Sequence, residues 1–324
     1  MPRQVRVSTI SWQRNALAAT VDQNLAKAQR LLELACATKP DIVCLPETFS
    51  SVNVPGRAAD LAESVPGPTT DMAAAAARRH GSYVICPLLE RRGDRVYNVA
   101  ALLDRRGQIV GTYEKVHPVT STADYTELES GVTPGAAAKV FETDLGRIGI
   151  LICFDLTFPA EWAAVHKLGA ELVFWPSAYN GGFPLRAFAS LYNYNVATAV
   201  QSDKSCIIDI TGEMLAESNH YTPIIEAQLD LEKKVYHTDF NASQLEAIRA
   251  KYGRDVLVRV LRDENWMTIE SRRQDLTVSQ IEAEFALERL DGYRARNQAA
   301  RDALAAGETP RPQQTRYMDH AIYV

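Results

Sequence analysis

The sequence predicts an α/β protein, because segments with the apolar spacing of helices alternate with short apolar runs typical of buried strands. The alternation begins with a strand-like run at residues 5–10 and a helix-like segment at 20–37. A second observation is an echo between residues 41–46 (DIVCLP) and 171–176 (ELVFWP), each of which follows a predicted helix. An acidic residue, an apolar run and a proline in both places indicate repeated helix-then-strand units. No short period recurs three times, so a solenoid is not predicted.

The other elements follow from periodicity and from the residues that flank each segment. Pro40 and Gly81 end the first two helices, and Lys167 with Gly169 is typical of a helix C-terminus. The predicted helices are 20–37, 70–80, 159–168 and 184–197. The predicted strands are 5–10, 41–45, 83–88, two runs flanking a turn at 105–107, 147–153 and 171–175, then a late meander at 205–210, 213–217 and 223–230.

Length and composition bound the domain count and exclude several classes of protein. The 324 residues suggest two domains, or one large α/β domain with an extension. With 46% hydrophobic and 23% charged residues the chain has an ordinary globular composition. No run of about 18 apolar residues occurs, so no membrane-spanning helix is expected. A net charge of -5 argues against a nucleic-acid surface, which needs clustered lysine and arginine.

The character of the chain changes after about residue 270. Residues 271–324 carry equal numbers of basic and acidic side chains, so the whole net charge belongs to residues 1–270. The later segment is too small to fold alone. We therefore expect one domain in 1–270 and a helical extension in 271–324 that packs on that domain or on another subunit.

Within the extension, Thr277 and Gln280 have the spacing of a capping box that opens a long helix. Its apolar stripe would consist of Ile281, Phe285 and Leu290. Turn and linker residues follow at 307–314, and the tail at 317–324 contains Met318, Ile322 and Tyr323.

The five cysteines are widely spaced and include no C-x-x-C pair, so neither a zinc ribbon nor a thioredoxin-type motif is predicted. They are Cys36, Cys44, Cys86, Cys153 and Cys206. Residues 1–10 lack the apolar core of a signal peptide. We therefore expect free thiols and a cytoplasmic location.

Cys153 stands where an apolar strand turns into a predicted helix that begins near Pro159. Backbone N–H groups at such a turn lower a thiol pKa and can bind an oxyanion, so the position predicts a nucleophile. The alternative is a buried, inert cysteine, the common fate of a free thiol.

Glu47 and Lys115 also stand just beyond predicted strands, where α/β sheets place catalytic groups. Taken singly, Glu47 could be a loop carboxylate and Lys115 a solvated surface lysine. A glutamate, a lysine and a cysteine that each close a strand together favour a catalytic site.

At these residues the sequence resembles the nitrilase, or carbon–nitrogen hydrolase, superfamily, in its amidase-like branch. The matching segments are 41–47 (DIVCLPE), 113–117 (YEKVH), 133–135 (TPG), 149–155 (GILICFD) and 169–177 (GAELVFWPS). The resemblance covers about residues 4–265. It implies a four-layer αββα sandwich of the nitrilase type, with the C-terminal helical extension added here.

The resemblance also implies a Glu–Lys–Cys triad. Carried over, Cys153 is the nucleophile, Glu47 the general base and Lys115 the charge that stabilises the tetrahedral intermediate, assisted by the Phe154 N–H. A thiol beside a base and a positive charge fits this chemistry.

The family has a second glutamate between the lysine and the cysteine, and Glu129 is the best match, ahead of Glu127 and Glu142. It would hold Lys115 or position substrate and water, although it could also be a loop carboxylate. Tyr179 and Asn180 follow a matching segment and would line the pocket, unless they only pack the loop.

Two departures from the family bear on the substrate. Many relatives place an arginine shortly after the cysteine, where it can bind a substrate carboxylate, but Leu156 and Thr157 stand there in this chain. Phe154 follows the cysteine where nitrilases more often have tryptophan, which favours amide over nitrile substrates.

The expected function is hydrolysis of a non-peptide C–N bond in a small linear amide or carbamoyl compound, through a cysteine thioester and with release of ammonia or an amine. The alternatives are a nitrilase, a thioester-based acyltransferase, and a non-catalytic subunit of the same fold. No metal-ligand cluster or nucleotide motif is seen, so neither a metal nor a cofactor is implied. We expect a small-molecule amide as partner, no nucleic acid or membrane, and a homodimer or larger homo-oligomer with contacts from 271–324.

Overall fold

The structure of the protein is a computed structural model that describes residues 3–310. It divides the chain into a larger unit, Val5–Leu229, and a C-terminal unit that begins at Asp230 and takes in the residues just before Val5. This division falls well before residue 270, where the sequence placed the boundary. The difference arises because residues 234–271 form a small sheet that shares a core with the later helices.

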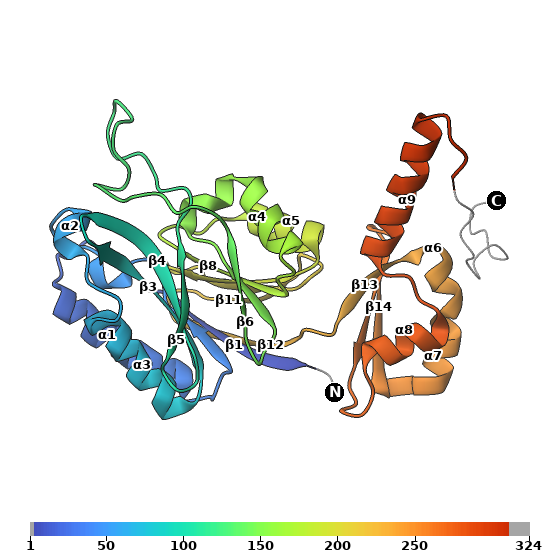
Figure 1. Cartoon of the computed structure of the whole chain (residues 1–324). Coiled ribbons are helices and arrows are strands. Elements are labelled where there is room, and N and C mark those ends of the chain that lie inside the picture. The colour runs from blue at the N-terminus through green and yellow to red at the C-terminus, as the bar shows by residue number, and fades with distance from the viewer. Residues whose placement is uncertain (1–2, 311–324) are drawn as a thin grey trace. The chain divides into compact units, whose positions relative to one another are not determined.

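The larger unit contains two six-stranded sheets (Figure 1). The first has the order β12-β1-β2-β3-β4-β5 and the second β11-β10-β9-β8-β7-β6. The strands of the first sheet are β1 (Gln4–Ile10), β2 (Ile42–Cys44), β3 (Tyr83–Arg92), β4 (Arg95–Leu103), β5 (Ile109–Glu114) and β12 (Ile224–Asp230). Those of the second are β6 (Lys139–Glu142), β7 (Arg147–Ile150), β8 (Leu172–Ser177), β9 (Asn195–Val200), β10 (Cys206–Ile208) and β11 (Met214–Glu217).

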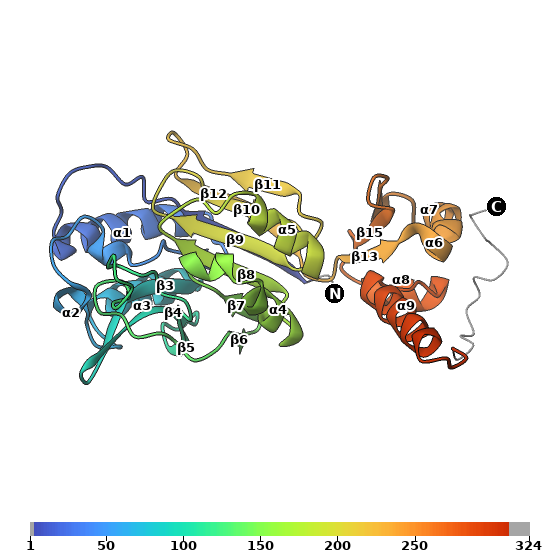
Figure 2. The same cartoon turned by 90° about the horizontal axis from the view of Figure 1, so that it is seen from above.

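Helices cover the outer face of each sheet, as Figures 1 and 2 show. On the first sheet lie α1 (Val21–Cys36) and α3 (Pro68–His80), and on the second α4 (Pro159–Lys167) and α5 (Phe183–Tyr192). The short helices are α2 (Ala58–Leu61), η1 (Phe49–Ser51) and η2 (Cys153–Thr157). Apolar faces of α1 and α3 share one buried cluster with β2, β3 and β4. The predicted αββα sandwich is therefore confirmed.

The echo in the sequence corresponds to the topology. In the first sheet β2 is the middle of three parallel strands, β1-β2-β3, and in the second β8 is the middle of β7-β8-β9. Helix α1 precedes β2, and α4 precedes β8. Each sheet therefore has one copy of this helix-then-strand arrangement at its parallel centre.

Two sequence expectations are wrong within this unit. The helix expected over 184–197 ends at Tyr192, because Asn193 adopts a left-handed conformation with φ 53°, and a strand follows. The Asn193 side chain donates to the carbonyls of Ser190 and Ile210 at 2.9 and 3.1 Å, which fixes this stop. The meander expected after residue 205 is also broken, since β12 joins the first sheet beside β1.

The C-terminal unit contains a three-stranded antiparallel sheet of order β13-β15-β14. Its strands are β13 (Lys234–His237), β14 (Val256–Leu261) and β15 (Trp266–Ser271). Its helices are α6 (Thr238–Asn241), η3 (Ala242–Gln244), α7 (Leu245–Tyr252), η4 (Gly253–Asp255), α8 (Val278–Phe285) and α9 (Leu290–Ala305). Residues from β15, α7 and α8, among them Met267, Ile248 and Ile281, form one buried core.

The capping box of Thr277 and Gln280 is present at the start of α8. The long helix expected from it is two helices, because Ala286 turns left-handed with φ 50° and ends α8. The tail at 317–324 and the second half of the linker, residues 311–314, lie outside the described residues. Within residues 3–310, the structure contains no helix of the length and apolar character needed to cross a membrane.

Gly135 offers a test of how tightly the loop before β6 packs against β5. A Cβ at this position would lie 2.4 Å from the Glu114 carbonyl oxygen, while the Gly135 N–H donates to the Lys115 carbonyl at 2.8 Å. We predict that Gly135→Ala lowers the free energy of unfolding by about 1–3 kcal/mol, because backbone must shift to relieve the overlap.

Chemical denaturation of the full chain measures this change. Gly292→Ala is the control, because its added Cβ would meet only Glu288 Cγ at 3.7 Å and alanine favours the helix. Equal denaturation midpoints for Gly135→Ala and the unaltered chain would contradict the prediction.

Candidate active site

The structure brings Glu47, Lys115 and Cys153 together in the larger unit. Glu47 lies just beyond β2, Lys115 directly follows β5, and Cys153 begins η2 after β7, so both sheets contribute. All three are buried, and with Glu129 they line one pocket of about 470 Å³. The structure thus brings these three strand-end residues to one pocket, and their catalytic roles stay a prediction.

Lys115 lies at the centre of a buried ionic cluster. Its Nζ is 2.8 Å from Glu47 Oε1 and pairs with Glu129 Oε1 as well, while the lysine side chain is only 1% exposed. Burial alone would lower the pKa of Lys115, but the negative charge of Glu47 and of Glu129 outweighs it and raises the pKa. The ammonium therefore stays charged inside the protein.

The structure separates the three glutamates between Lys115 and Cys153. Glu129 contacts Lys115 and accepts a hydrogen bond from the Val119 N–H at 3.0 Å. Glu127 instead pairs with Arg57, and Glu142 is 2.7 Å from Arg147. Glu129 is therefore the one of the three that belongs to the cluster.

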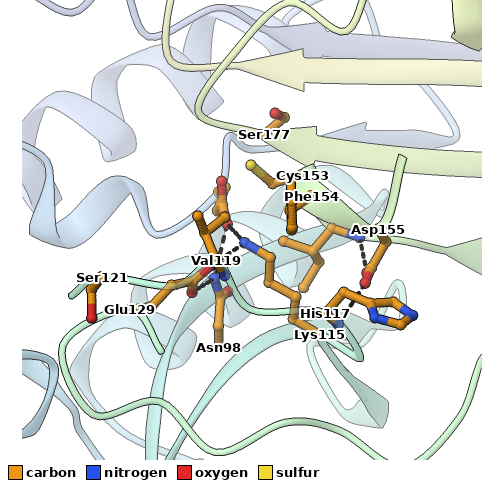
Figure 3. Close-up of polar contacts among 12 residues, drawn as sticks. Asn98, Lys115, His117, Val119, Ser121, Glu129, Cys153, Phe154, Asp155 and Ser177 are labelled. Carbon is orange, nitrogen blue, oxygen red and sulfur yellow. Dashed lines mark hydrogen bonds and ion pairs between the residues drawn. The ribbon is translucent and has the colours of Figure 1, made fainter. Parts of the chain in front are cut away.

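Asn98 on β4 completes the cluster, although no sequence motif indicated it. Its Nδ2 donates to Glu47 Oε1 at 2.9 Å and to Glu129 Oε2 at 3.0 Å, and its backbone carbonyl accepts the Lys115 backbone N–H at 2.8 Å. Figure 3 shows Asn98 beside Glu129 and Lys115. The amide thus fixes both carboxylates relative to the lysine. A polar residue inside the apolar strand RVYNVAALL was the signal that could have found it.

The two carboxylate oxygens of Glu47 differ in their surroundings. Oε1 accepts from Lys115 and Asn98, whereas Oε2 is buried without a hydrogen-bond partner among the described residues. The Glu47 carbonyl accepts from Gln201 Nε2 at 2.8 Å, which holds its loop. The result is a fixed carboxylate with one open acceptor in the pocket that Cys153 also lines.

Cys153 has a strained backbone. Its φ is 48°, a left-handed conformation that costs a residue with a Cβ about 1–2 kcal/mol. Its carbonyl accepts from Trp175 Nε1 at 2.9 Å, and the preceding Ile152 N–H donates to Asp155 Oδ2 at 2.8 Å. These contacts hold the sharp turn that places the sulfur.

Asp155 also joins this turn to the segment that carries Lys115. Its carboxylate accepts from the Tyr113 hydroxyl at 2.7 Å and from the His117 N–H at 2.9 Å. Asp155 is fully buried, and that burial raises its pKa against the effect of these hydrogen bonds. It acts as a turn residue that ties the second sheet to the end of β5.

The surroundings of Cys153 favour its neutral thiol over the thiolate. Burial and the nearby Glu47 carboxylate raise its pKa to about 12, against the opposing effects of Lys115 and of hydrogen bonds with Ser177 and Ala178. The lowered pKa expected from its position at a strand-to-helix turn is therefore wrong. A neutral thiol can attack only if a base removes its proton during the step.

The remaining predicted residues, Phe154, Tyr179 and Asn180, are not among the residues that line this pocket. Phe154 follows Cys153 in η2, at the first turn, where an N–H has no acceptor within the helix. The neighbouring Ala178 does line the pocket. The Tyr179 ring packs edge-on against the Trp175 ring, with 5.2 Å between the ring centroids. The Asn180 side-chain oxygen accepts a hydrogen bond from the Ser202 hydroxyl. A substrate contact from Phe154, Tyr179 or Asn180 stays a prediction.

The pocket wall also contains residues that no sequence motif indicated. Arg14, Asn53 and Gln201 line it from three separate loops. Loop residues of this kind carry no periodic signal, so only the tertiary structure identifies them. No group of three or more His, Cys, Asp or Glu side chains within residues 3–310 is arranged to hold a metal ion.

Comparisons with known proteins agree with this geometry. The profile of the carbon–nitrogen hydrolase family matches residues 5–234, which spans the larger unit. Omega-amidase NIT2 of Xenopus tropicalis is 30% identical over 233 residues, 65% of this chain and 84% of its own length. Omega-amidase NIT2 of Danio rerio is 27% identical over 232 residues, which is 64% of this chain and 83% of its own length. Beta-ureidopropionase of Arabidopsis thaliana is 31% identical over 195 residues, which is 56% of this chain and 47% of its own length.

Solved structures show the same fold. An amidase from Nesterenkonia sp. superposes with a TM-score of 0.60 at 22% identity, covering 70% of this chain and 90% of that one. The C. elegans NitFhit protein superposes with a TM-score of 0.62 at 21% identity, covering 76% of this chain and 63% of its own. With the family profile, the two sheets and the resemblance of the sequence motifs all in agreement, the chain belongs to the carbon–nitrogen hydrolase family of the nitrilase superfamily.

Proposed function

We propose that this carbon–nitrogen hydrolase cleaves small linear amides or carbamoyl compounds through a thioester on Cys153. The observation that carries the proposal is the Glu47 carboxylate, one oxygen of which is bound by Lys115 and Asn98 while the other is buried and open. A general base needs such an open acceptor beside the proton that it removes. Cys153, a neutral thiol in the same pocket, is the group that requires one.

In the first half-reaction, Glu47 takes the thiol proton as the Cys153 sulfur attacks the amide carbon. The Lys115 ammonium has three N–H groups, two of which are used by Glu47 and Glu129, so the third can face the developing oxyanion. The Phe154 N–H is the second proposed donor to this oxygen. Glu47 then gives its proton to the amide nitrogen, the C–N bond breaks, and ammonia or an amine leaves a thioester.

In the second half-reaction, water attacks the thioester carbonyl while Glu47 accepts one of its protons. The carbon–sulfur bond breaks, the carboxylic acid departs, and the proton returns to the sulfur. The sum is amide plus water to acid plus ammonia or amine. Glu129 and Asn98 act through Lys115 and Glu47, since they hold the two charged groups in register.

An amide is favoured over a nitrile as the substrate. Relatives named omega-amidase are, by that name, amide hydrolases. Phe154 instead of tryptophan after the nucleophile points the same way. A nitrilase or an acyltransferase would share the thioester and differ in the compound supplied or in the acceptor, so product identification separates them. The intact cluster of Glu47, Lys115 and Cys153 argues against a non-catalytic subunit.

Two further properties belong to the same proposal. A cytoplasmic location is supported by five cysteines that are all free thiols. A homodimer or larger homo-oligomer is supported by large apolar side chains left exposed on α5, with Phe183 75% and Leu191 52% exposed. Sedimentation of the full chain measures the oligomer directly, and a monomer would contradict it.

The central prediction is a covalent intermediate on Cys153. Intact-mass spectrometry after rapid quenching with a panel of primary amides should show the chain carrying one acyl group, because acylation precedes hydrolysis. Cys153→Ala should neither acquire this mass nor release ammonia. Ammonia release by Cys153→Ala would refute the mechanism.

Glu129 and Glu127 form a matched pair of substitutions on one loop. We predict that Glu129→Gln lowers kcat by roughly 10–100-fold, because Lys115 loses a half-buried charged partner that orients it toward the oxyanion. Glu127→Gln removes only the partly exposed pair with Arg57 and should change kcat by less than about twofold. Steady-state ammonia release measures both, and equal effects of the two substitutions would contradict the role given to Glu129.

The raised pKa of Cys153 predicts its titration. A group with a pKa of about 12 stays protonated at neutral pH and loses its proton only as the pH rises far into the alkaline range. The difference in thiolate absorbance between the unaltered chain and Cys153→Ala should therefore stay flat up to about pH 9, beyond the ordinary thiol pKa. A thiolate signal that appears below neutral pH would show an activated resting thiol instead.

A further inference from the structure

A short seam, formed by residues 11–14 and 200–205, joins the two sheets of the larger unit. Three backbone N–H groups of residues 12–14 donate to the carbonyls of residues 200–202, at distances between 2.8 and 3.0 Å. Residues 11–14 follow β1 of the first sheet, and residues 200–202 stand at the end of β9 of the second. The seam therefore fixes the end of β9 against the first sheet.

Buried hydroxyl groups reinforce this seam. The Oγ atom of Ser11 lies 2.7 Å from the Oγ atoms of both Ser205 and Ser218, and all three serines are at most 1% exposed. The Val200 N–H donates to Ser205 Oγ at 3.1 Å. The short connection 201–204 is thus held at both of its ends.

Gln201 is the residue of the seam that reaches the catalytic cluster. It is 6% exposed and lines the pocket. Its Nε2 donates to the Glu47 carbonyl at 2.8 Å, and its backbone N–H donates to the Ser177 carbonyl at 2.9 Å. Ser177 ends β8, and its side chain forms a hydrogen bond with the Cys153 thiol, beside which it lies in Figure 3. One residue therefore contacts both the segment that carries Glu47 and the segment that holds the thiol.

The other contacts of Glu47 do not fix it relative to Cys153. Lys115 and Asn98, which bind Glu47 Oε1, belong with Glu47 to the first sheet, whereas Cys153 follows β7 of the second. The hydrogen bonds of Asp155 join the second sheet to the chain on either side of Lys115. The bond from Gln201 joins the second sheet to Glu47 itself.

We propose that Gln201 is a positioning residue that sets the distance between the Glu47 carboxylate and the Cys153 sulfur. The inference rests on the proposed function, because it takes Glu47 as the base and Cys153 as the nucleophile. Proton transfer needs the two heavy atoms within hydrogen-bond reach, about 2.6–3.2 Å, so a small shift between the sheets slows the reaction. Gln201 acts through the Glu47 backbone and takes no part in bond breaking.

The first test is Gln201→Met, which keeps an unbranched side chain of similar length and removes the donor. We expect kcat for ammonia release to fall about tenfold or more, because the base is no longer held beside the thiol. KM should change by less than about twofold, since the substrate contacts remain. A raised KM with an unchanged kcat would show that Gln201 binds substrate instead, and would overturn the proposal.

Gln13→Met is the matched control on the same seam. The Gln13 Nε2 donates to the carbonyls of Asn219 and His220 at 3.2 and 2.6 Å, and Gln13 is not among the residues that line the pocket. This substitution should leave kcat within about twofold, because the contact with Glu47 remains. An equal loss in both variants would mean that the seam as a whole, and not the contact of Gln201 with Glu47, supports the activity, which would contradict the proposal.

Gln201→Glu adds a dependence on pH that a merely structural role would not produce. The introduced carboxyl can donate to the Glu47 carbonyl only while it is protonated. The ratio of its kcat to that of the unaltered chain should therefore fall as the pH rises through the carboxyl pKa. The other charged or titratable side chains of the pocket lining are the same in both chains and leave this ratio unaffected; they are Arg14, Glu47, Lys115, Glu129 and Cys153. Full activity at about pH 8, where the introduced carboxyl is ionised, would overturn the proposal.

An activated ester separates this inference from the proposed function. When p-nitrophenyl acetate acylates Cys153, the S–C bond forms, the C–O bond breaks and p-nitrophenolate leaves, while Glu47 takes the thiol proton, so no C–N bond is involved. The first turnover, followed by p-nitrophenolate absorbance and corrected with Cys153→Ala, should be about tenfold slower in Gln201→Met.

An unchanged or faster first turnover overturns the role of Gln201 even if amides are hydrolysed, and so does the absence of any turnover that depends on Cys153. Absence of ammonia from every amide refutes the proposed function, while the ester still decides whether Gln201 positions the base.

Discussion

The buried ammonium of Lys115 is the charge around which the active site is organised. A lysine that is 1% exposed is tolerated only with anionic partners, and Glu47 and Glu129 provide them from two separate loops. Asn98 then links the two carboxylates. The need to compensate one buried cation thus fixes the positions of β2, β4, the end of β5 and the loop that carries Glu129. It also leaves Glu47 with a single open oxygen.

The second sheet is joined to this cluster by Asp155. Its hydrogen bonds from Ile152, Tyr113 and His117 connect the strained turn at Cys153 to the chain on either side of Lys115. The same burial that protects the cluster raises the pKa of the Cys153 thiol. In the proposed mechanism, activation therefore depends on a base positioned by the fold. Arg14 lines the same pocket but takes part in none of these contacts.

Much of the fold could be predicted from the sequence, because it rests on local patterns. The parallel strands β2 and β8 and the helices before them follow from apolar periodicity and from proline and glycine at the ends of segments. The stop at Asn193 was missed because a left-handed asparagine is one of several outcomes that the local sequence allows. The sheet that β12 joins could not be predicted, since an alternating apolar pattern specifies a strand and not its neighbour.

For the candidate active site, the sequence by itself indicated the reacting groups of the proposed mechanism. Glu47, Lys115 and Cys153 each follow a strand, and motifs around them identify the family. Only the tertiary structure decided that Glu129 and not Glu127 holds the lysine, that Asn98 links the carboxylates, that the thiol pKa is raised, and that Arg14 faces the same pocket. The physical reason is that pairing, desolvation and pocket lining depend on distances between residues far apart in the chain, which no local pattern encodes.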